Sequence, residues 1–339
     1  MTTTVKRNAN PTLTDLMDSL DPNGQIADVV EALNETNEML QDMTFVECNN
    51  KFSHQTTVRS GLPKATWRKL NYGVQPSKSE KRKVTDSCGM LEAMAKVDKK
   101  LAVMNGMKES WRASEDSAFV EAMNQEVQRA LLFSDSSVDP EKIMGLAPRF
   151  STCNASKAAN AVNVIDAGGT GNDLTSIWLI GWSPKTVHCI YPENSQVGLE
   201  REDRGEGIAY DEDGGEYICL RTHFEWDLGL CVRDWRYVVR IANIKQSLLK
   251  PVPPEQNSST GHNLYELLVK AEAQVPSLQG ARFAFYCNRT VETYLRLQQA
   301  NSKNVQLSLS DVGGHKVLGF DSIPFRRVDA LTFTEKQVK

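Results

Sequence analysis

The sequence predicts an α+β fold, and three observations support this prediction. Residues 115–133 carry apolar side chains at helical spacing over about five turns. After residue 150, short apolar runs alternate with glycine, proline and polar turns, which is typical of strands. Residues 54–90 resemble two extended strands with very few apolar side chains. Because a two-stranded ribbon is marginally stable alone, we expect this segment to rest on another surface.

The pattern of the first 50 residues predicts an arm and not a separate domain. Residues 1–10 are polar, residues 13–20 have apolar side chains at helical spacing, and Asp21–Gly24 has the composition of a turn. A second helix is expected over residues 25–43. Two short amphipathic helices cannot enclose a core, so their apolar stripes must rest on something else.

The charge pattern changes sharply between this arm and the following segment. Residues 8–50 contain nine acidic and no basic side chains, whereas residues 64–83 contain seven basic and one acidic, giving −9 and +6. We expect the two segments to meet between neighbouring copies, and prefer this to binding of a phosphate backbone by residues 78–83. The candidate contact residues are Asp28, Glu31, Glu35, Glu38, Trp67, Arg68, Lys69, Lys78, Lys81, Arg82 and Lys83.

The segment 115–133 is the clearest helix in the chain. Ser114 is a suitable N-cap, and Glu115 and Asp116 suit the positive end of the helix dipole. The residues expected to form its buried stripe are Phe119, Met123, Val127 and Leu131. Residues 134–140 should end it.

The rest of the chain alternates between strands and helices. Strands are expected at 176–182, 186–191, 217–222, 228–233, 237–244, 281–287, 305–310 and 316–320, and helices at 263–273 and 290–299. Residues 200–216 should form an acidic, glycine-rich loop, and residues 251–262 a linker.

Composition argues against several classes of protein. The net charge of −4 gives no global attraction for nucleic acid, and no apolar run is long enough for a signal peptide or a membrane span. The seven cysteines form no C-x-x-C pair and the five histidines no H-x-x-x-H pair, which argues against a disulfide framework or a zinc site. We therefore expect no catalytic residues, no metal and no cofactor.

Two glycine-containing segments resemble ligand-binding loops. Residues 167–171 follow a short apolar run as a phosphate-binding loop would, but no Lys-Ser/Thr follows and the glycine spacing is wrong. Residues 211–216 are acidic, but their glycine comes too early for a calcium-binding loop. We expect a turn and a solvated loop.

From residue 65 onward the order of features becomes specific. A tryptophan-containing strand at 65–69 leads to Gly-Val-Gln-Pro-Ser-Lys-Ser at 73–79 and to a Lys-Val-Asp-Lys-Lys-Leu segment at 96–101. The long helix closes with residues 128–135, and Ile-Met-Gly-Leu follows at 143–146. This order resembles the Hong Kong 97-type capsid proteins, in which an extended loop leads into a spine helix.

The ends of the chain extend the resemblance. Residues 281–289 resemble the strand–Asn–helix unit of the family's apical domain, residues 319–326 its closing strand, and residues 10–15 the acidic arm of major capsid proteins from short-tailed (podovirus-like) phages. Strands at 224–244 precede the apical-type segment, so a rearranged strand order is an alternative. The resemblance implies the following organisation: arm 1–50, extended β-hairpin loop 51–92, peripheral domain with the spine helix 93–150, apical domain 151–216, peripheral strands 217–250, and second apical part with closing strand 251–339.

The resemblance also implies a function. A structural protein of this family, not an enzyme, self-assembles into hexamers and pentamers of an icosahedral shell around double-stranded DNA, which it contacts weakly. Portal, scaffold and cement or decoration proteins are its expected partners, and the virion capsid, made in the host cytoplasm, its expected location. Two alternatives are a cargo-enclosing nanocompartment, which shares the fold, and a nucleotide-dependent phage enzyme that uses residues 168–171.

Overall fold

A computed structural model describes residues 38–103, 108–211, 213–251, 261–301, 307–312 and 315–339. Its residues cluster into two compact units. The first contains Met90–Val127 and Gln196–Asp227, and the second Thr36–Gly89, Gln128–Ser195 and Leu228–Lys339. The strands expected over 217–250 are thus divided between the two units at residue 227. Among the described helices, none combines the length and apolar character that crossing a membrane requires.

The second unit is built around a buried central strand, β5 (Leu174–Trp182), in which every residue is buried. Its two neighbours, β9 (Val238–Lys245) and β10 (Arg282–Cys287), run antiparallel to it. β4 (Val164–Asp166) extends the sheet beside β9, and β13 (Ile323–Arg327) extends it beside β10, both in parallel pairings. These strands have nearly continuous apolar sequences because both faces of the sheet are covered.

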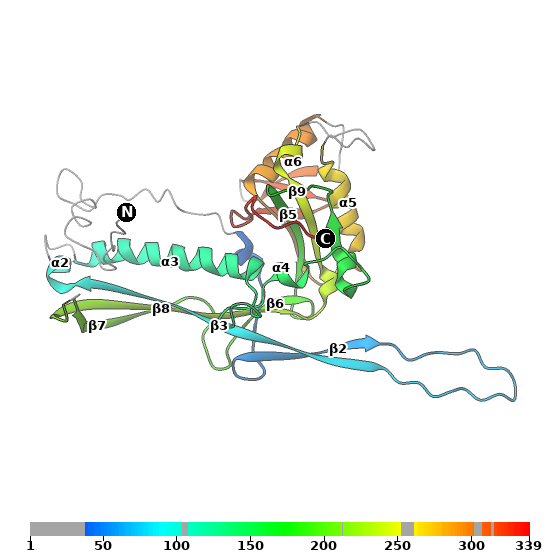
Figure 1. The fold of residues 1–339 in the computed structure, drawn as a ribbon, viewed down its shortest axis with the longest axis horizontal. Coiled ribbons are helices and arrows are strands. Elements are labelled where there is room, and N and C mark those ends of the chain that lie inside the picture. Colours follow the sequence, from blue (N-terminus) through cyan, green and yellow to red (C-terminus); the bar gives the residue numbers. More distant parts are fainter. Residues whose placement is uncertain (1–37, 104–107, 212, 252–260, 302–306, 313–314) are drawn as a thin grey trace. The chain divides into compact units, whose positions relative to one another are not determined.

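Two helices, α5 (Leu264–Gln274) and α6 (Arg289–Asn301), lie against this sheet (Figure 1). The Asn263 side chain caps α5 by accepting a hydrogen bond from the Glu266 amide. The helices and strands share one apolar core, to which each element contributes alternate or helically spaced side chains. Its members include Ile177, Leu179, Val239, Ile241, Leu264, Leu268, Phe283, Phe285, Val291 and Leu295. The hairpin of β11 (Leu307–Val312) and β12 (His315–Phe320) joins β13 at the end of the strand order.

The described end of the arm is part of the second unit. A single 3-10 turn, η1 (Glu38–Gln41), leads into the short strand β1 (Phe45–Glu47). β1 pairs in parallel with β6 (Val187–Tyr191). The predicted helix over 25–43 is therefore wrong at its end, since residues 38–41 form a tighter turn and docking onto β6 extends the chain. Residues 13–20 and 25–37 lie outside the described residues.

The extended segment forms a ribbon, which we define as β2 (Ser53–Gly61), residues 62–79 and the first part of β3 (Glu80–Asp98). β2 and β3 pair antiparallel from Ser53↔Ser87 to Gly61↔Glu80 (Figure 1). The strand expected at residues 65–70 is wrong, because residues 62–79 contain no regular strand and residues 62–78 are all exposed. We call residues 62–79 the ribbon tip.

The first unit contains a second hairpin where a loop was expected. β7 (Glu200–Tyr210) pairs antiparallel with β8 (Glu216–Val232) from Glu200↔Glu225 to Tyr210↔Glu216, so the predicted acidic loop over 200–216 is wrong. Two acidic side chains of β7 pair with basic residues elsewhere in the first unit. Asp203 accepts a hydrogen bond from Arg112, and Lys99 pairs with Glu206. The Arg112 guanidinium and the Gly205 amide hold the pKa of Asp203 below its usual value.

The long helix is present and begins earlier than predicted. α3 spans Lys108–Phe133, so Ser114 lies inside it and is not its N-cap. Met123 and Val127 in the first unit are buried, as is Leu131 in the second. Phe119 is half-buried and stacks on the buried Phe224, with ring centroids 5.6 Å apart and an interplanar angle of 6°.

The stacked pair gives a first testable prediction. We expect Phe119→Asp to yield insoluble subunits, because it removes an aromatic contact and places a carboxylate against the buried Phe224 ring. Truncating a packed phenylalanine costs about 3–5 kcal/mol before the charge is counted. Soluble yield and urea denaturation measure the effect. Val120→Asp is the matched control, since Val120 is exposed on the same helix. Equal behaviour of the two variants would show that Phe119 does not belong to the core.

Candidate assembly surfaces

The ribbon tip exposes large apolar side chains to an unusual degree. Relative exposures are 78% for Leu62, 104% for Trp67, 84% for Leu70 and 70% for Tyr72. Single exposed apolar residues are normal, but four within eleven residues of one segment indicate a contact surface. No described part of the subunit covers these side chains, which makes them candidates for a contact with another copy.

The ribbon is also strongly basic along β3. Lys81, Arg82 and Lys83 are exposed, and none forms an ion pair with any residue that the structure describes. Lys81 lies directly opposite Arg59 on β2. Like charges at opposed positions destabilise an antiparallel pair, so an acidic partner would stabilise the ribbon. Arg68, Lys69 and Lys78 extend the basic surface along the tip, where all three are exposed.

A groove beside the end of β2 nearest the ribbon tip continues this basic surface. It has a volume of about 510 Å³ and is lined by β2 and by residues 233–236. The basic side chains in its lining are Arg59, Lys185, Arg233 and Arg236. The one acidic residue there, Asp234, already accepts hydrogen bonds from the Arg236 guanidinium. Burial raises the pKa of Asp234, but the hydrogen bonds from the Arg236 guanidinium and amide outweigh it and hold this pKa below its usual value. The groove therefore has cationic groups available for a carboxylate ligand.

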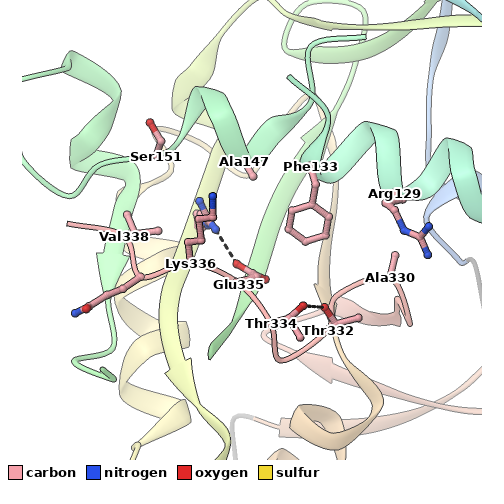
Figure 2. Close-up of a pocket in the computed structure, with 12 residues that line it drawn as sticks. Arg129, Phe133, Ala147, Ser151, Ala330, Thr332, Thr334, Glu335, Lys336 and Val338 are labelled. Atoms are coloured by element: carbon pink, nitrogen blue, oxygen red, sulfur yellow. Dashed lines mark hydrogen bonds and ion pairs between the residues drawn. The ribbon is translucent and has the colours of Figure 1, made fainter. Parts of the chain in front are cut away.

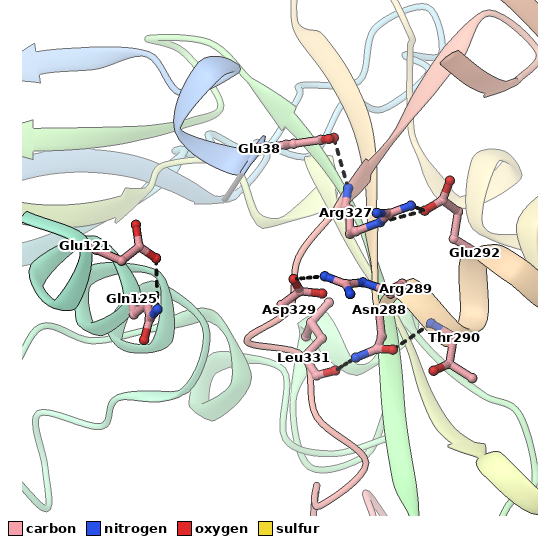
Figure 3. A network of polar contacts seen from close by, with 10 residues as sticks. All are labelled: Glu38, Glu121, Gln125, Asn288, Arg289, Thr290, Glu292, Arg327, Asp329 and Leu331. Atoms are coloured by element: carbon pink, nitrogen blue, oxygen red, sulfur yellow. Dashed lines mark hydrogen bonds and ion pairs between the residues drawn. The ribbon is translucent and has the colours of Figure 1, made fainter. Parts of the chain in front are cut away.

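The described acidic residues of the arm act inside their own subunit. Asp42 is buried and accepts hydrogen bonds from the Arg326 guanidinium at 2.9 and 3.1 Å and from the Tyr286 hydroxyl at 3.2 Å. Glu38 accepts a hydrogen bond from the Arg327 amide, and the Arg327 side chain pairs with Glu292 (Figure 3). Glu38 and Asp42 thus anchor the arm to β13. The candidates Asp28, Glu31 and Glu35 lie outside the described residues.

A second cavity lies beside the C-terminal segment and is used structurally. It has a volume of about 510 Å³, and its lining includes Arg129, Phe133 and the segment 332–338 (Figure 2). Glu335 projects into it and pairs with the buried Arg240 at 2.7 Å, while also accepting from the Ser176 hydroxyl. These polar groups tie the chain end to β5 and β9. We therefore interpret this cavity as part of the packing of the C-terminal segment against the sheet.

Residues 167–171 form a turn. The Gly168 amide donates to the Asp166 carboxylate and the Gly169 amide donates to the Asn243 carbonyl, so these two donors are already used. A Cβ on Gly169 would lie 2.3 Å from the Asn243 carbonyl oxygen, which explains glycine there. Likewise, the Asp211 carboxylate accepts hydrogen bonds from the amides of Asp213 and Gly215 in the β7–β8 turn.

Comparison with known proteins supports a shell-forming role. The family model described as major capsid protein GP7 matches residues 21–339. A capsid structure of bacteriophage Epsilon15 is 34% identical, covers 99% of both chains and has a TM-score of 0.76. The bacteriophage JBD30 capsid is 11% identical over 89% of this chain and 93% of that one, with a TM-score of 0.46, too low to carry an argument. No curated protein sequence matches the chain.

The family model covers nearly all of the chain, and the Epsilon15 likeness extends over its full length. The α+β fold is accordingly the Hong Kong 97-like capsid fold, as the resemblance implied, and copies of the protein assemble into a capsid shell. The exposed apolar tip, and a basic strand without ion pairs among the described residues, are compatible with such an assembly. The chain belongs to the major capsid protein GP7 family and is a structural subunit of a bacteriophage capsid.

Proposed function

We propose that the subunit forms hexamers and pentamers of an icosahedral shell that encloses double-stranded DNA. The observation that carries this proposal is the ribbon, whose apolar tip and basic strand are not covered by any residue of their own subunit that the structure describes. A head-to-tail contact between copies repeats by rotation until a ring closes, and rings of two sizes can close a shell. A net charge of −4 keeps attraction to the genome weak.

We further propose that the basic ribbon and groove of one subunit receive the acidic arm of a neighbour. Residues 8–37 carry six acidic and no basic side chains once Glu38, Asp42 and Glu47 are set aside. The ribbon and groove present cations that form no described ion pair, apart from Arg236. Opposite charges steer docking and fix its register, while Trp67 and its apolar neighbours supply buried area.

The proposed role is structural, with portal, scaffold and cement proteins as partners during synthesis in the host cytoplasm. Electron microscopy of the expressed protein, with any scaffold protein supplied, tests it. We expect closed shells in which the ribbon tip is protected from proteolysis. A compact monomer that persists at high concentration with the tip equally protected would contradict the proposal, because the tip would then have found cover within one subunit.

A further inference from the structure

Four side chains of the kinds that bind metal ions lie near one another in one row at the base of the ribbon, on four neighbouring strands. The neighbouring strands β6, β8, β3 and β2 each contribute one residue: His188, Cys231, Asp86 and His54 respectively. The register places His188 opposite Cys231 and Asp86 opposite His54. This row is a consequence of strand pairing, and all four residues belong to the second unit.

The sheet brings the ends of this row together. Strands lie about 4.8 Å apart, so three strand spacings would separate His54 from His188 by about 14 Å in a flat sheet. Their ring centroids are instead 5.4 Å apart, with an edge-to-face angle of 87°. Close approach of β8 to β3 contributes to this, since a Cβ on Gly229 would lie 2.7 Å from the Ser87 carbonyl oxygen. One ligand atom from each of His54, His188 and Cys231 lies within 4.8 Å of the others.

Several polar atoms of these side chains are buried without a described hydrogen-bond partner. His188 is 1% exposed, and neither of its ring nitrogens has a hydrogen-bond partner among the residues that the structure describes. The backbone of Ser183 is close enough to favour the charged imidazole but does not complete a hydrogen bond of good geometry. His54 Nδ1 and Asp86 Oδ2 are also buried and have no hydrogen-bond partner in the described part of the chain, and Cys231 is fully buried. Buried polar groups without partners are costly, so a cluster of them indicates a missing ligand.

We propose that His54, His188 and Cys231, with Asp86 as the fourth ligand, bind one divalent transition-metal ion of the zinc type. Two imidazoles, one thiolate and one carboxylate form a donor set that zinc accepts in tetrahedral sites. Zinc bond lengths place such ligand atoms about 3.3–3.6 Å apart, so ligand atoms that lie within 4.8 Å of one another need to approach by at most about 1.5 Å on binding. Rotation of the two histidine side chains supplies a movement of this size.

The charges around the cluster suit this ion. Burial, together with the neighbouring His54, lowers the pKa of His188 to about 4, so its imidazole is neutral and able to coordinate. Burial, with Asp86 next, raises the pKa of the Cys231 thiol to about 12, so without metal the thiol keeps its proton. Coordination would release that proton to solvent, and one thiolate with one carboxylate would neutralise the divalent ion. Arg149 holds the other Asp86 oxygen at 2.7 Å, which orients the carboxylate, and Arg233 is the second cation that faces the histidines.

Such an ion would fasten the ribbon where it leaves the sheet. It would link β2 and β3, which form the ribbon, to β6 and to the end of β8 that belongs to the second unit. The ribbon's direction would then be fixed before it meets a neighbouring subunit. The cluster escaped the sequence analysis because its ligands come from four strands and have no characteristic spacing in the chain.

Metal analysis of the full-length protein tests this inference. Apo protein, prepared with a chelator and then dialysed against Zn²⁺, should retain about one ion per subunit by elemental analysis. Cys231→Ser and His188→Asn should each reduce Zn²⁺ affinity by about 100-fold or more, since loss of an outer-shell partner alone costs 10–100-fold. Cys153→Ser and Cys48→Ser are the matched controls, because both thiols lie outside the cluster, and each should bind as the parent does.

A second measurement needs no variant. Co²⁺ loaded into the parent protein should show the ultraviolet charge-transfer absorption of a thiolate bond and the visible bands of tetrahedral cobalt. Absence of the thiolate absorption, or unchanged Zn²⁺ retention in both cluster variants, would overturn the proposal. Loss of binding in Cys48→Ser alone would overturn it too, since the ion would then belong to the neighbouring Cys48 and Cys88 thiols, whose sulfur atoms are 3.4 Å apart.

Discussion

Lys81→Glu combined with Arg82→Glu should abolish shell assembly while leaving the subunit folded. Both side chains are exposed on β3 and form no described ion pair, so their reversal removes nothing from the subunit's own core. It would change the net charge of residues 64–83 from +6 to +2 and so weaken steering of the acidic arm. Each exposed ion pair contributes only about 0–1 kcal/mol, but the shell repeats the contact in every copy.

Restoring the opposite charge should restore assembly in part. Glu31→Lys with Glu35→Lys is the suitable compensating pair, because these positions are four residues apart and share one face of the helix expected over 25–43. Glu38 is unsuitable, since it accepts a hydrogen bond from the Arg327 amide of its own subunit. Light scattering and electron microscopy of the double, compensating and quadruple variants measure the effect.

Lys157→Glu with Lys336→Glu is the matched control, with the same charge change at exposed positions outside the ribbon. It should assemble normally. Rising salt should slow assembly of the parent protein, since exposed charges are screened beyond about 10 Å at 0.1 M, although apolar contacts oppose that trend. If the ribbon variant instead forms empty shells normally and fails only to package DNA, the basic strand faces the genome and the proposed arm–ribbon contact is wrong.

Local pattern predicted the regular elements best where burial is strong. The strands β5, β6, β9 and β10 were predicted to within two residues, and the long helix was predicted with its correct end but a start seven residues too late, because each has a periodic or continuous apolar sequence. β7 was missed since its acidic residues are all exposed, and two of them pair with basic residues from distant segments. Its strand character comes from pairing with β8, which no local signal of β7 reveals.

Some of the contact residues could likewise be predicted from the sequence, and others could not. Exposure and charge on the ribbon could be predicted from composition alone, because residues 64–83 lack a core-forming pattern. Asp42 has the same local character as the other acidic residues of the arm, yet it is buried beside Arg326 and Tyr286. Only tertiary pairing, across more than 240 residues of chain, distinguishes an anchoring acid from a free one.

Breaking the ion pair between Arg240 and Glu335 should cause a large loss of stability. Their side chains are 5% and 7% exposed, and the Arg240 guanidinium also lies over the Trp178 ring at 5.0 Å. Glu335→Ala would leave a buried guanidinium without its counter-ion and the Ser176 hydroxyl without its acceptor. Removing one partner of a buried pair costs about 3–5 kcal/mol, so the free energy of unfolding should fall by that amount.

Urea denaturation of unassembled subunits, followed by tryptophan fluorescence, measures this loss. Lys336→Ala, at the adjacent exposed position, should change the free energy of unfolding by less than about 0.5 kcal/mol. Arg240→Met combined with Glu335→Leu should be less destabilised than Glu335→Ala, because an apolar pair leaves no buried charge. A loss below about 1 kcal/mol in Glu335→Ala, the range of exposed pairs, would show that water reaches the guanidinium and that the C-terminal segment is not fastened to β9 by this pair.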